Sequence, residues 1–321
     1  MMKYELGIGV VPKANVVVAL DEAATVGAKA EPRKARRTQI LSLSKGAAAT
    51  SRKMKSGFVR FSVFFCAGLT LSVLIFMLAY IMVKGILYLQ PSLFEWKYTS
   101  ENCSVMPSLI NTILMTVLAL LIASPLGIGS AIYLVEYAAK ENRFVKLVRL
   151  TTETLTGIPS IVYGLFGMLL FVGTFHWGYS LMAGSSTVAI MILPVIMRTT
   201  EEALFSVPDS FREGSFGLGA GKLRTVFKIV LPDAMPGILS GVILATGRVV
   251  GETAALMYTA GTVSQIPLGV FGSGRTLAVH MYILSSEGLH TNQAFATAVV
   301  LLLMVMIVNL LTEKLAVKIG K

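Results

Sequence analysis

Charged side chains inside an apolar stretch are the residues of this chain whose types and spacing could do chemistry. Arg248 and Glu252 lie four positions apart in the stretch 238–258, which is otherwise largely apolar. If that stretch is one helix, the two side chains share a face. The guanidinium would offer a fork of N–H donors to an anion, and the carboxylate would orient it. The alternative is a permanent ion pair that only locks neighbouring helices together.

Three further polar residues are candidates for contact with an anion that passes along these apolar stretches. Arg198 ends another apolar stretch beside Thr199 and Thr200, where it either reaches the aqueous interface or guides an anion. Ser160 and Tyr163 lie in a stretch with several glycines, which favour close packing of helices. These two side chains either belong to that packing or give the path a polar lining.

No arrangement of residues indicates catalysis or metal binding. We find no Ser/His/Asp or Cys/His constellation, and His176, His280 and His290 are expected in solvated loops without the spacing of a metal motif. Cys66 lies inside an apolar stretch and Cys103 outside one, so no disulfide is expected between them. We therefore expect no enzyme activity in this chain and no cofactor bound by it.

Composition places these residues in a membrane protein. Of the 321 residues, 55% are hydrophobic and only 14% are charged, against about 25% charged in soluble domains. An apolar stretch of roughly 20 residues is long enough to cross a bilayer as a helix. Six such spans are expected, at 61–83, 109–135, 158–175, 179–197, 238–258 and 294–311.

The positive charge is distributed as in a membrane protein, so no binding of nucleic acid is expected despite a net charge of +11. All Lys and Arg except Lys84, Lys97, Arg248 and Arg275 lie in the N-terminal tail, at the C-terminus, or around the loops after the second and fourth spans. Segments rich in Lys and Arg stay in the cytoplasm. Both ends of the chain are therefore expected there.

Four regions are expected along the chain. Residues 1–57, rich in Ala, Lys and Arg, predict a disordered basic cytoplasmic tail that helps to fix topology or binds anionic lipid or a partner. Residues 58–315 form the six-span domain, with a cytoplasmic loop at 200–236 inside it. Residues 316–321 form a second cytoplasmic tail.

The segment 212–238 has the pattern of two short amphipathic helices joined by a turn. Ser210 and Glu213 fit a capping box at the first helix. Three glycines within 217–221 supply positions for positive φ, and a second helix over 222–230 is expected to end at the prolines that follow. Apolar and aromatic side chains on this bracket indicate contact with a protein partner or, alternatively, with the lipid surface.

The same segment resembles the EAA loop of ABC importer permeases. That motif reads Glu-Ala-Ala, three residues, Gly, nine residues, Ile-x-Leu-Pro, and it is matched here in spacing throughout. Gly and Ser replace the two alanines, so small residues are retained. In the family this loop docks as a coupling helix on the ATP-binding subunit. The resemblance assigns that contact to Glu213, Gly214, Ser215, Gly219, Leu231 and Pro232.

Three other stretches resemble phosphate permeases in particular. They read GIPSIVYGLFG at 157–167, LPVIMRTTEEAL at 193–204 and TGRVVGETAAL at 246–256. With the EAA loop, they make roughly residues 60–315 similar to the PstA-type subunit of the high-affinity phosphate importer. The resemblance implies an all-α, six-helix type I importer permease fold (MetI-like) that carries phosphate by alternating access.

The resemblance also implies partners and a location. The partners are a homologous PstC-type permease, two PstB-type ATP-binding subunits that use ATP and Mg²⁺, and an external PstS-type phosphate-binding protein, in a bacterial or archaeal cytoplasmic membrane. We find no Walker A pattern in this sequence, so the ATPase is expected on another polypeptide. Two alternatives stay open, a permease for another oxyanion such as sulfate or molybdate, and a secondary carrier.

Overall fold

The computed structural model describes residues 33–139 and 142–319, with side chains described within 59–139 and 142–314. The chain divides into two units, Met1–Ile75 and Phe76–Lys321. In order, the elements are α2 (Arg33–Ile86), η1 (Pro91–Phe94), α3 (Met106–Ile132), η2 (Tyr133–Tyr137), α4 (Arg143–Thr156), α5 (Ser160–Gly167), η3 (Met168–Thr174), α6 (Leu181–Ser206), α7 (Asp209–Gly217), α8 (Lys222–Thr225), η4 (Val226–Val230), α9 (Leu231–Val250), α10 (Ala254–Met257), α11 (Leu277–Glu287) and α12 (Thr291–Ile319).

Helix α2 begins at Arg33, inside the region 1–57 that the sequence analysis expects to be disordered. The prediction therefore differs from the structure over 33–57. Ala, Lys and Arg, which are frequent there, have high helix propensity, whereas the prediction weighed charge and low hydropathy. Residues 1–32 and 320–321, parts of the two predicted tails, lie outside the described residues.

Five helical segments among the described residues are long and apolar enough to cross a membrane. They are Val59–Ile86, Met106–Tyr137, Leu181–Ser206, Lys222–Val250 and Thr291–Lys314. Each overlaps a predicted span. No strand occurs within 33–139 or 142–319, so the all-helical class is confirmed.

The sixth apolar segment is a broken pair of helices. The predicted span 158–175 corresponds to α5 and η3, and these meet α4 at a bend of 106°. Pro159 precedes α5 with an extended backbone, ψ 142°, and a proline disfavours helical geometry at the residue before it. The chain therefore turns sharply between Thr156 and Ser160, and α4 is a helix of its own rather than a plain polar connection.

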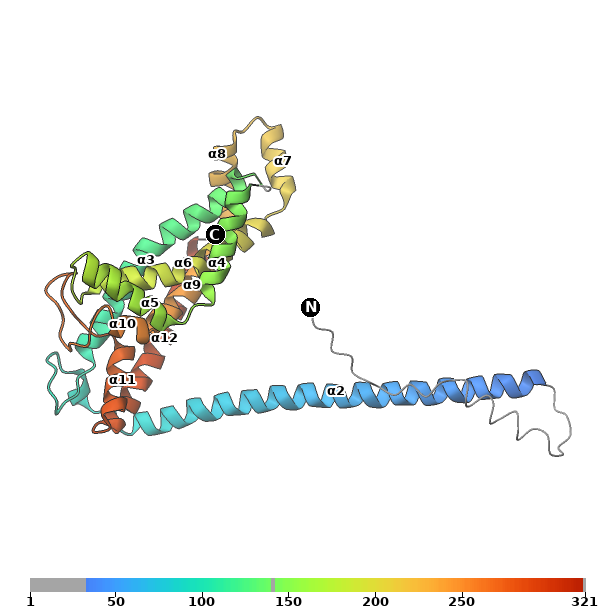
Figure 1. Ribbon diagram of the computed structural model, residues 1–321, viewed down its shortest axis with the longest axis horizontal. Coiled ribbons are helices and arrows are strands. Elements are labelled where there is room, and N and C mark those ends of the chain that lie inside the picture. The colour runs from blue at the N-terminus through green and yellow to red at the C-terminus, as the bar shows by residue number, and fades with distance from the viewer. Residues whose placement is uncertain (1–32, 140–141, 320–321) are drawn as a thin grey trace. The chain divides into compact units, whose positions relative to one another are not determined.

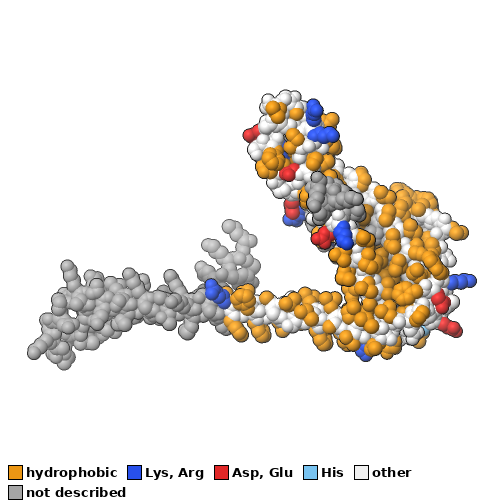
Figure 2. Space-filling view, turned by 180° about the vertical axis from the view of Figure 1, so that it is seen from behind, with side chains coloured by type: hydrophobic (Ala, Val, Ile, Leu, Met, Phe, Trp, Pro, Cys, Tyr) orange, Lys and Arg blue, Asp and Glu red, His pale blue; other side chains and the backbone are white. Residues whose placement is uncertain are grey.

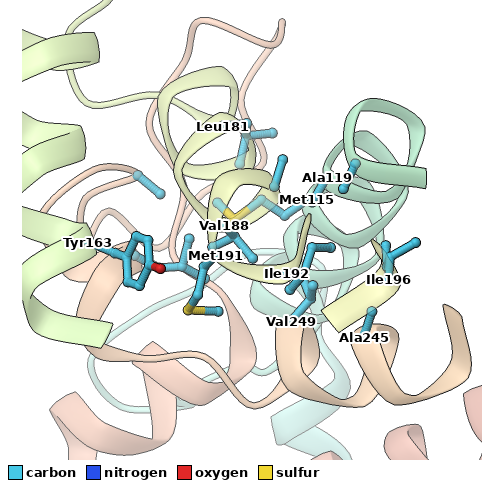
Figure 3. Packing of buried hydrophobic residues seen from close by; sticks show 14 of the residues in the cluster. Met115, Ala119, Tyr163, Leu181, Val188, Met191, Ile192, Ile196, Ala245 and Val249 are labelled. Carbon is cyan, nitrogen blue, oxygen red and sulfur yellow. The ribbon is translucent and has the colours of Figure 1, made fainter. Parts of the chain in front are cut away.

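Helix α6 is the centre of the second unit. Its apolar window is 72% buried, against 33% for those of α3, the α8–α9 segment and α12. Figure 3 shows Met115 of α3 and Val249 of α9 around α6, which contributes Met191 and Ile192 to the same core cluster. Burial of this core holds the helices that carry the candidate site.

Small residues allow close contacts around this core, as the sequence indicates. A Cβ on Gly164 of α5 would lie 2.8 Å from Cα of Ala255, and one on Gly237 of α9 would lie 2.6 Å from Cβ of Ala203. Both distances are shorter than van der Waals contact, so a larger residue would push the helices apart. The packing role predicted for the glycines of 157–167 is confirmed at Gly164.

The region after α9 departs most from the expected plan. The predicted fifth span stops early, because α9 ends at Val250 and the short helix α10 follows. The expected external loop contains α11, whose residue His280 is fully buried, so the prediction of a solvated His280 is wrong. Helix α11 is too short for a span, which hid it from hydropathy reasoning. Both Cys66 and Cys103 are free, as expected.

Candidate functional site

Helices α7 and α8 form a hairpin at one end of the unit, opposite α11 (Figure 1). The turn between them contains Gly219 at φ +81°, a left-handed backbone conformation that glycine adopts without cost. The glycine turn is thus confirmed at this position. Gly217 and Gly221 do not have positive φ, because Gly217 still belongs to α7 and Gly221 is already the extended N-cap of α8.

The predicted capping box is wrong. Helix α7 begins at Asp209 after Pro208, and no side chain caps its first turn. Ser210 is therefore inside the helix, where its hydroxyl cannot act as an N-cap. The Asp209 carboxylate, which favours a helix start through the dipole, accepts a hydrogen bond from Nη1 of Arg212 at 3.2 Å instead.

The prolines after the hairpin do not end its second helix. Segment Lys222–Val250 is continuous, with Pro232 in the first turn of α9 and Pro236 inside it. The π-helical turn η4 precedes Pro232, and Leu231 N–H donates to the carbonyl of Val226. This wider turn accommodates a residue that has no N–H to donate. Movement of the hairpin can therefore pass directly into α9.

Arg212 joins the hairpin to the membrane bundle. Its Nη2 lies 2.8 Å from Oε1 of Glu136 in η2, and Nε lies 3.1 Å from the same oxygen. Nη1 also donates to the carbonyl of Val207 and Nη2 to that of Leu204, at 2.8 and 2.9 Å. Both charged side chains are largely buried, at 14% and 8% exposure. The sequence analysis missed Glu136, although a lone carboxylate next to an apolar span was a usable signal.

Two other contacts hold the hairpin in place. The ammonium of Lys222 lies 5.3 Å from the centre of the Tyr137 ring, within cation–π range. Between the two helices, Oγ of Ser215 and Oγ1 of Thr225 share a hydrogen bond of 2.8 Å. Ser215 is buried there, so the small residue of the EAA-like motif serves the inner contact of the hairpin.

The outer surface of the hairpin carries several exposed apolar side chains although it lies outside the bundle. Lys, Arg, Asp and Glu gather on this lobe among apolar side chains, whereas apolar side chains cover most of the bundle surface (Figure 2). The exposed large side chains here are Phe211, Phe216, Leu218, Leu223 and Phe227. Glu213 and Gly214 are exposed on the same hairpin, Leu231 is half-buried and Pro232 exposed. An apolar patch rimmed by charges is typical of a protein contact.

Arg248 and Glu252 are not paired, contrary to the prediction. Arg248 is half-buried in the last turn of α9, and Glu252 lies beyond the helix end at Gly251. The two therefore do not share a helix face. Glu252 is buried, and its Oε1 accepts a hydrogen bond from Ala255 N–H at 3.0 Å. No ion pair or side-chain hydrogen bond joins Arg248 to any other residue whose side chain is described.

Tyr163 and Ser160 have different roles in α5, since Ser160 is the first residue of that helix. The hydroxyl of Tyr163 donates to the carbonyl of Leu155 at 2.7 Å. Tyr163 is buried at one side of the core cluster that also contains Met191 and Val249 (Figure 3). Its hydroxyl satisfies a carbonyl in the last turn of α4, which favours packing over lining. Ser160 is half-buried.

Arg198 lines a pocket that does not include Arg248. The pocket lies between α4 and α6 and is lined by Arg149, Thr152, Glu153, Thr156, Arg198, Glu201, Glu202 and Phe205. Arg198 pairs with Glu202 at 3.0 Å, and Arg149 with Glu201 at 3.2 Å. The sequence analysis did not single out Arg149, which becomes a site candidate only because the bend after α4 brings it to α6.

Comparison with known proteins agrees with this architecture. Residues 123–321 match the sequence model of the family described as "Binding-protein-dependent transport system inner membrane component". The chain is 33% identical over 277 residues to a probable ABC transporter permease protein, YqgI of Bacillus subtilis, covering 80% of this chain and 93% of that protein. It is 31% identical over 271 residues to the phosphate transport system permease protein PstA of Mycobacterium leprae, covering 81% and 88%.

A third relative and two solved structures extend the likeness. The phosphate transport system permease protein PstA 1 of Mycobacterium tuberculosis is 37% identical over 206 residues, 63% of this chain and 67% of its own. A bacterial ABC transporter for import of alginate has a TM-score of 0.61 at 14% identity, covering 85% of this chain and all of that one. The MetNI methionine ABC transporter has a TM-score of 0.54 at 19% identity, covering 68% and 94%.

These findings confirm the MetI-like importer permease fold and a multi-pass membrane protein. The relatives are permeases, so the chain is a transport component of a membrane complex rather than a catalytic enzyme. The family match includes the broken pair, the α7–α8 hairpin and both candidate anion contacts, Arg198 and Arg248. This protein belongs to the family of binding-protein-dependent transport system inner membrane components.

Proposed function

We propose that this chain is the permease subunit of an ATP-driven importer that carries inorganic phosphate into the cytoplasm by alternating access. The observation that carries this proposal is its likeness to permeases named for phosphate transport, at 31% and 37% identity over long segments. The geometry is compatible with any small oxyanion, so the choice of phosphate over sulfate or molybdate rests on that likeness.

Arg248 is the proposed contact for the transported anion. A half-buried guanidinium without a carboxylate partner, in a helix of a membrane bundle, favours an anion in its neighbourhood. Glu252 acts as a positioning residue, since its bond to Ala255 N–H fixes the chain where α9 ends. Tyr163 and Ser160 stay candidates for the wall of the path, with Tyr163 committed to the α4 carbonyl.

The pocket of Arg198 and Arg149 is the proposed inner mouth. Each arginine has a glutamate partner within 3.2 Å, and Glu153 adds a third carboxylate to the lining. An oxyanion would therefore have to displace a partner to bind either guanidinium. Such a site binds weakly, which suits release into the cytoplasm better than capture.

The α7–α8 hairpin is the proposed contact with the ATP-binding subunit. Its exposed apolar side chains would enter that subunit, which would hold ATP and Mg²⁺. Arg212 and the continuous α8–α9 segment would carry the movement into the bundle, since they connect the hairpin to η2 and to Arg248. The other partners would be a homologous PstC-type permease and an external PstS-type binding protein. In this arrangement both ends of the chain lie in the cytoplasm.

Uptake of labelled phosphate by a strain that lacks the gene tests the proposal. Complementation with the wild type should restore uptake, and Arg248→Gln should lower it about 10-fold or more, because a charged hydrogen bond contributes about 1.5–3 kcal/mol. Arg143→Gln, the same change at an exposed position, should restore uptake fully. Normal uptake and coupled ATPase activity with Arg248→Gln in assembled complexes would remove the role of Arg248.

A second variant tests the coupling. Gly219→Pro should abolish uptake, because proline cannot adopt φ +81°. Gly178→Pro is the matched control, since Gly178 has φ +65° in the turn before α6, away from the hairpin. Wild-type uptake with Gly219→Pro, with the variant present in the membrane, would refute the coupling role. Inhibition by sulfate or molybdate would indicate another oxyanion, and uptake without any ATP-binding subunit would indicate a secondary carrier.

A further inference from the structure

A second arginine is buried at the end of the bundle opposite the hairpin. Arg275 precedes α11 and is only 5% exposed. Its backbone is fixed on both sides, because its N–H donates to the carbonyl of Val263 at 2.9 Å and its carbonyl accepts from Nδ2 of Asn111 at 3.3 Å. The guanidinium carbon lies 4.6 Å from the centre of the Tyr98 ring. Among the described residues, these contacts of the Arg275 backbone and guanidinium are all with neutral groups.

The guanidinium of Arg275 has an unused binding edge. Its Nε and Nη2 are fully buried and have no hydrogen-bond partner among the described residues. No carboxylate of those residues lies within 4.0 Å of it, since the four ion pairs there involve only other arginines. Nε and Nη2 form the side of the guanidinium that binds two oxygens at once. A buried cation without a partner is unfavourable, so this edge calls for an anion.

His280 and Cys103, which lie near Arg275, are both neutral, and His280 has an unused acceptor. The carboxylate of Glu287 acts on this cluster, where it adds to burial in raising the pKa of Cys103. His280 is fully buried, and burial together with the charge of Arg275 lowers its pKa to about 3. Its Nε2 lies 3.2 Å from the carbonyl of Cys103, so the neutral ring donates there and its Nδ1 is an acceptor. That Nδ1 has no partner among the described residues. Burial raises the pKa of the Cys103 thiol, which therefore stays neutral too.

We infer that this cluster, defined as Tyr98, Cys103, Arg275 and His280, is an oxyanion site for inorganic phosphate. Two phosphate oxygens would accept from Nε and Nη2 of Arg275, and the protonated oxygen of hydrogen phosphate would donate to Nδ1 of His280. Sulfate offers the same acceptors but no O–H. The choice of phosphate rests on the proposed function, whereas the requirement for an oxyanion rests on the unpaired guanidinium.

Thermal melting of the complex tests the site without transport. The chain is purified with its partner subunits in lipid nanodiscs, without nucleotide or binding protein, and melted at increasing inorganic phosphate or sulfate. Wild type should be stabilised by phosphate more than by sulfate. Arg275→Met should raise the phosphate concentration for half-maximal stabilisation about 10-fold or more, while melting no lower than wild type in anion-free buffer, because it removes an unpaired buried charge. Arg275→Lys keeps the charge without the fork and should fall between the two.

Three outcomes would overturn the inference. They are no stabilisation of wild type, an unchanged phosphate response in Arg275→Met, and a lower melting temperature of that variant without anions, which would make Arg275 a structural partner of Tyr98. Arg143→Gln, a change at an exposed position, is the control and should leave the phosphate response as in wild type. If phosphate uptake fails in cells while this dependence holds, the proposed function is wrong and the oxyanion site stands. If uptake succeeds and the dependence is absent, this inference alone fails.

Discussion

Arg212 and Arg275 are both largely buried, at opposite ends of one bundle, yet their surroundings differ completely. Every nitrogen of Arg212 has a partner, with Glu136, Asp209, Leu204 and Val207 supplying the oxygens. Two nitrogens of Arg275 have none among the described residues. Its guanidinium instead lies over the Tyr98 ring.

The difference separates two uses of a buried charge. A guanidinium whose donors are all satisfied holds elements together, and a ligand could reach it only by breaking several bonds at once. A guanidinium whose Nε and Nη2 donors have no partner can still bind a ligand through them. By this criterion Arg212 is the residue that holds the hairpin on the bundle, and Arg275 and Arg248 are the proposed anion contacts.

Breaking the ion pair between Arg212 and Glu136 should have the largest effect. Glu136→Gln removes the buried counter-charge of Arg212 and leaves it only the exposed carboxylate of Asp209, and loss of one partner of a buried ion pair costs about 3–5 kcal/mol. We expect faster amide hydrogen exchange across α7 and α8 and loss of ATPase coupling in the assembled complex. Glu101→Gln makes the same change at an exposed loop position and should leave both unchanged. Equal amide hydrogen exchange in the two variants would show that the ion pair does not hold the hairpin on the bundle.

Acid should selectively weaken the Arg275 end. The folded pKa of His280 is about 3, below its ordinary value of 6.5, so the unfolded state binds the extra proton between these values. Stability is complete above pH 6.5 and falls as the pH decreases towards 3, with a loss of about 2 kcal/mol at pH 5. Thermal melting at pH 7.5 and 5 measures this loss.

Two variants sharpen the acid prediction. His280→Gln should reduce the loss between pH 7.5 and 5, because no imidazole remains to be protonated. Arg275→Met should reduce it partly, since the charge of Arg275 contributes to the lowered pKa. An acid response that is the same in all three proteins would place its origin elsewhere and leave His280 without a role in it.

The sequence predicts the apolar segments and the hairpin, but not the ion pair that joins Arg212 to Glu136. Hydropathy finds the apolar segments because each span needs many residues to agree, and the EAA spacing finds the hairpin. Neither pattern pairs Arg212 with Glu136, which are far apart in the chain and meet only where α7 folds back onto η2.

Helix ends limited the prediction of the anion contacts. The pairing of Arg248 with Glu252 assumed an unbroken helix, and a stop at Gly251 places Glu252 elsewhere. Likewise α11 is short and follows a loop rich in glycine, so His280 was expected in solvent and Arg275 was not singled out. Burial of such residues depends on contacts with α3 and α12, which no local pattern contains.

The smallest effects should come from Gly214 and Gly219 of the hairpin. Substitution by Ala should change the stability of the hairpin in opposite directions at these two positions. Gly214 is exposed inside α7, and a Cβ there would meet no atom within 4 Å, so Gly214→Ala should stabilise the hairpin by up to about 1 kcal/mol. Gly219 is as open, but its φ of +81° makes Gly219→Ala unfavourable by about 1–2 kcal/mol. Hydrogen exchange of α7 and α8 in the assembled complex measures both. Because neither Cβ meets a neighbour, opposite signs would show that backbone conformation sets the stability of the turn, and equal signs would contradict the assignment of Gly219 as its conformational requirement.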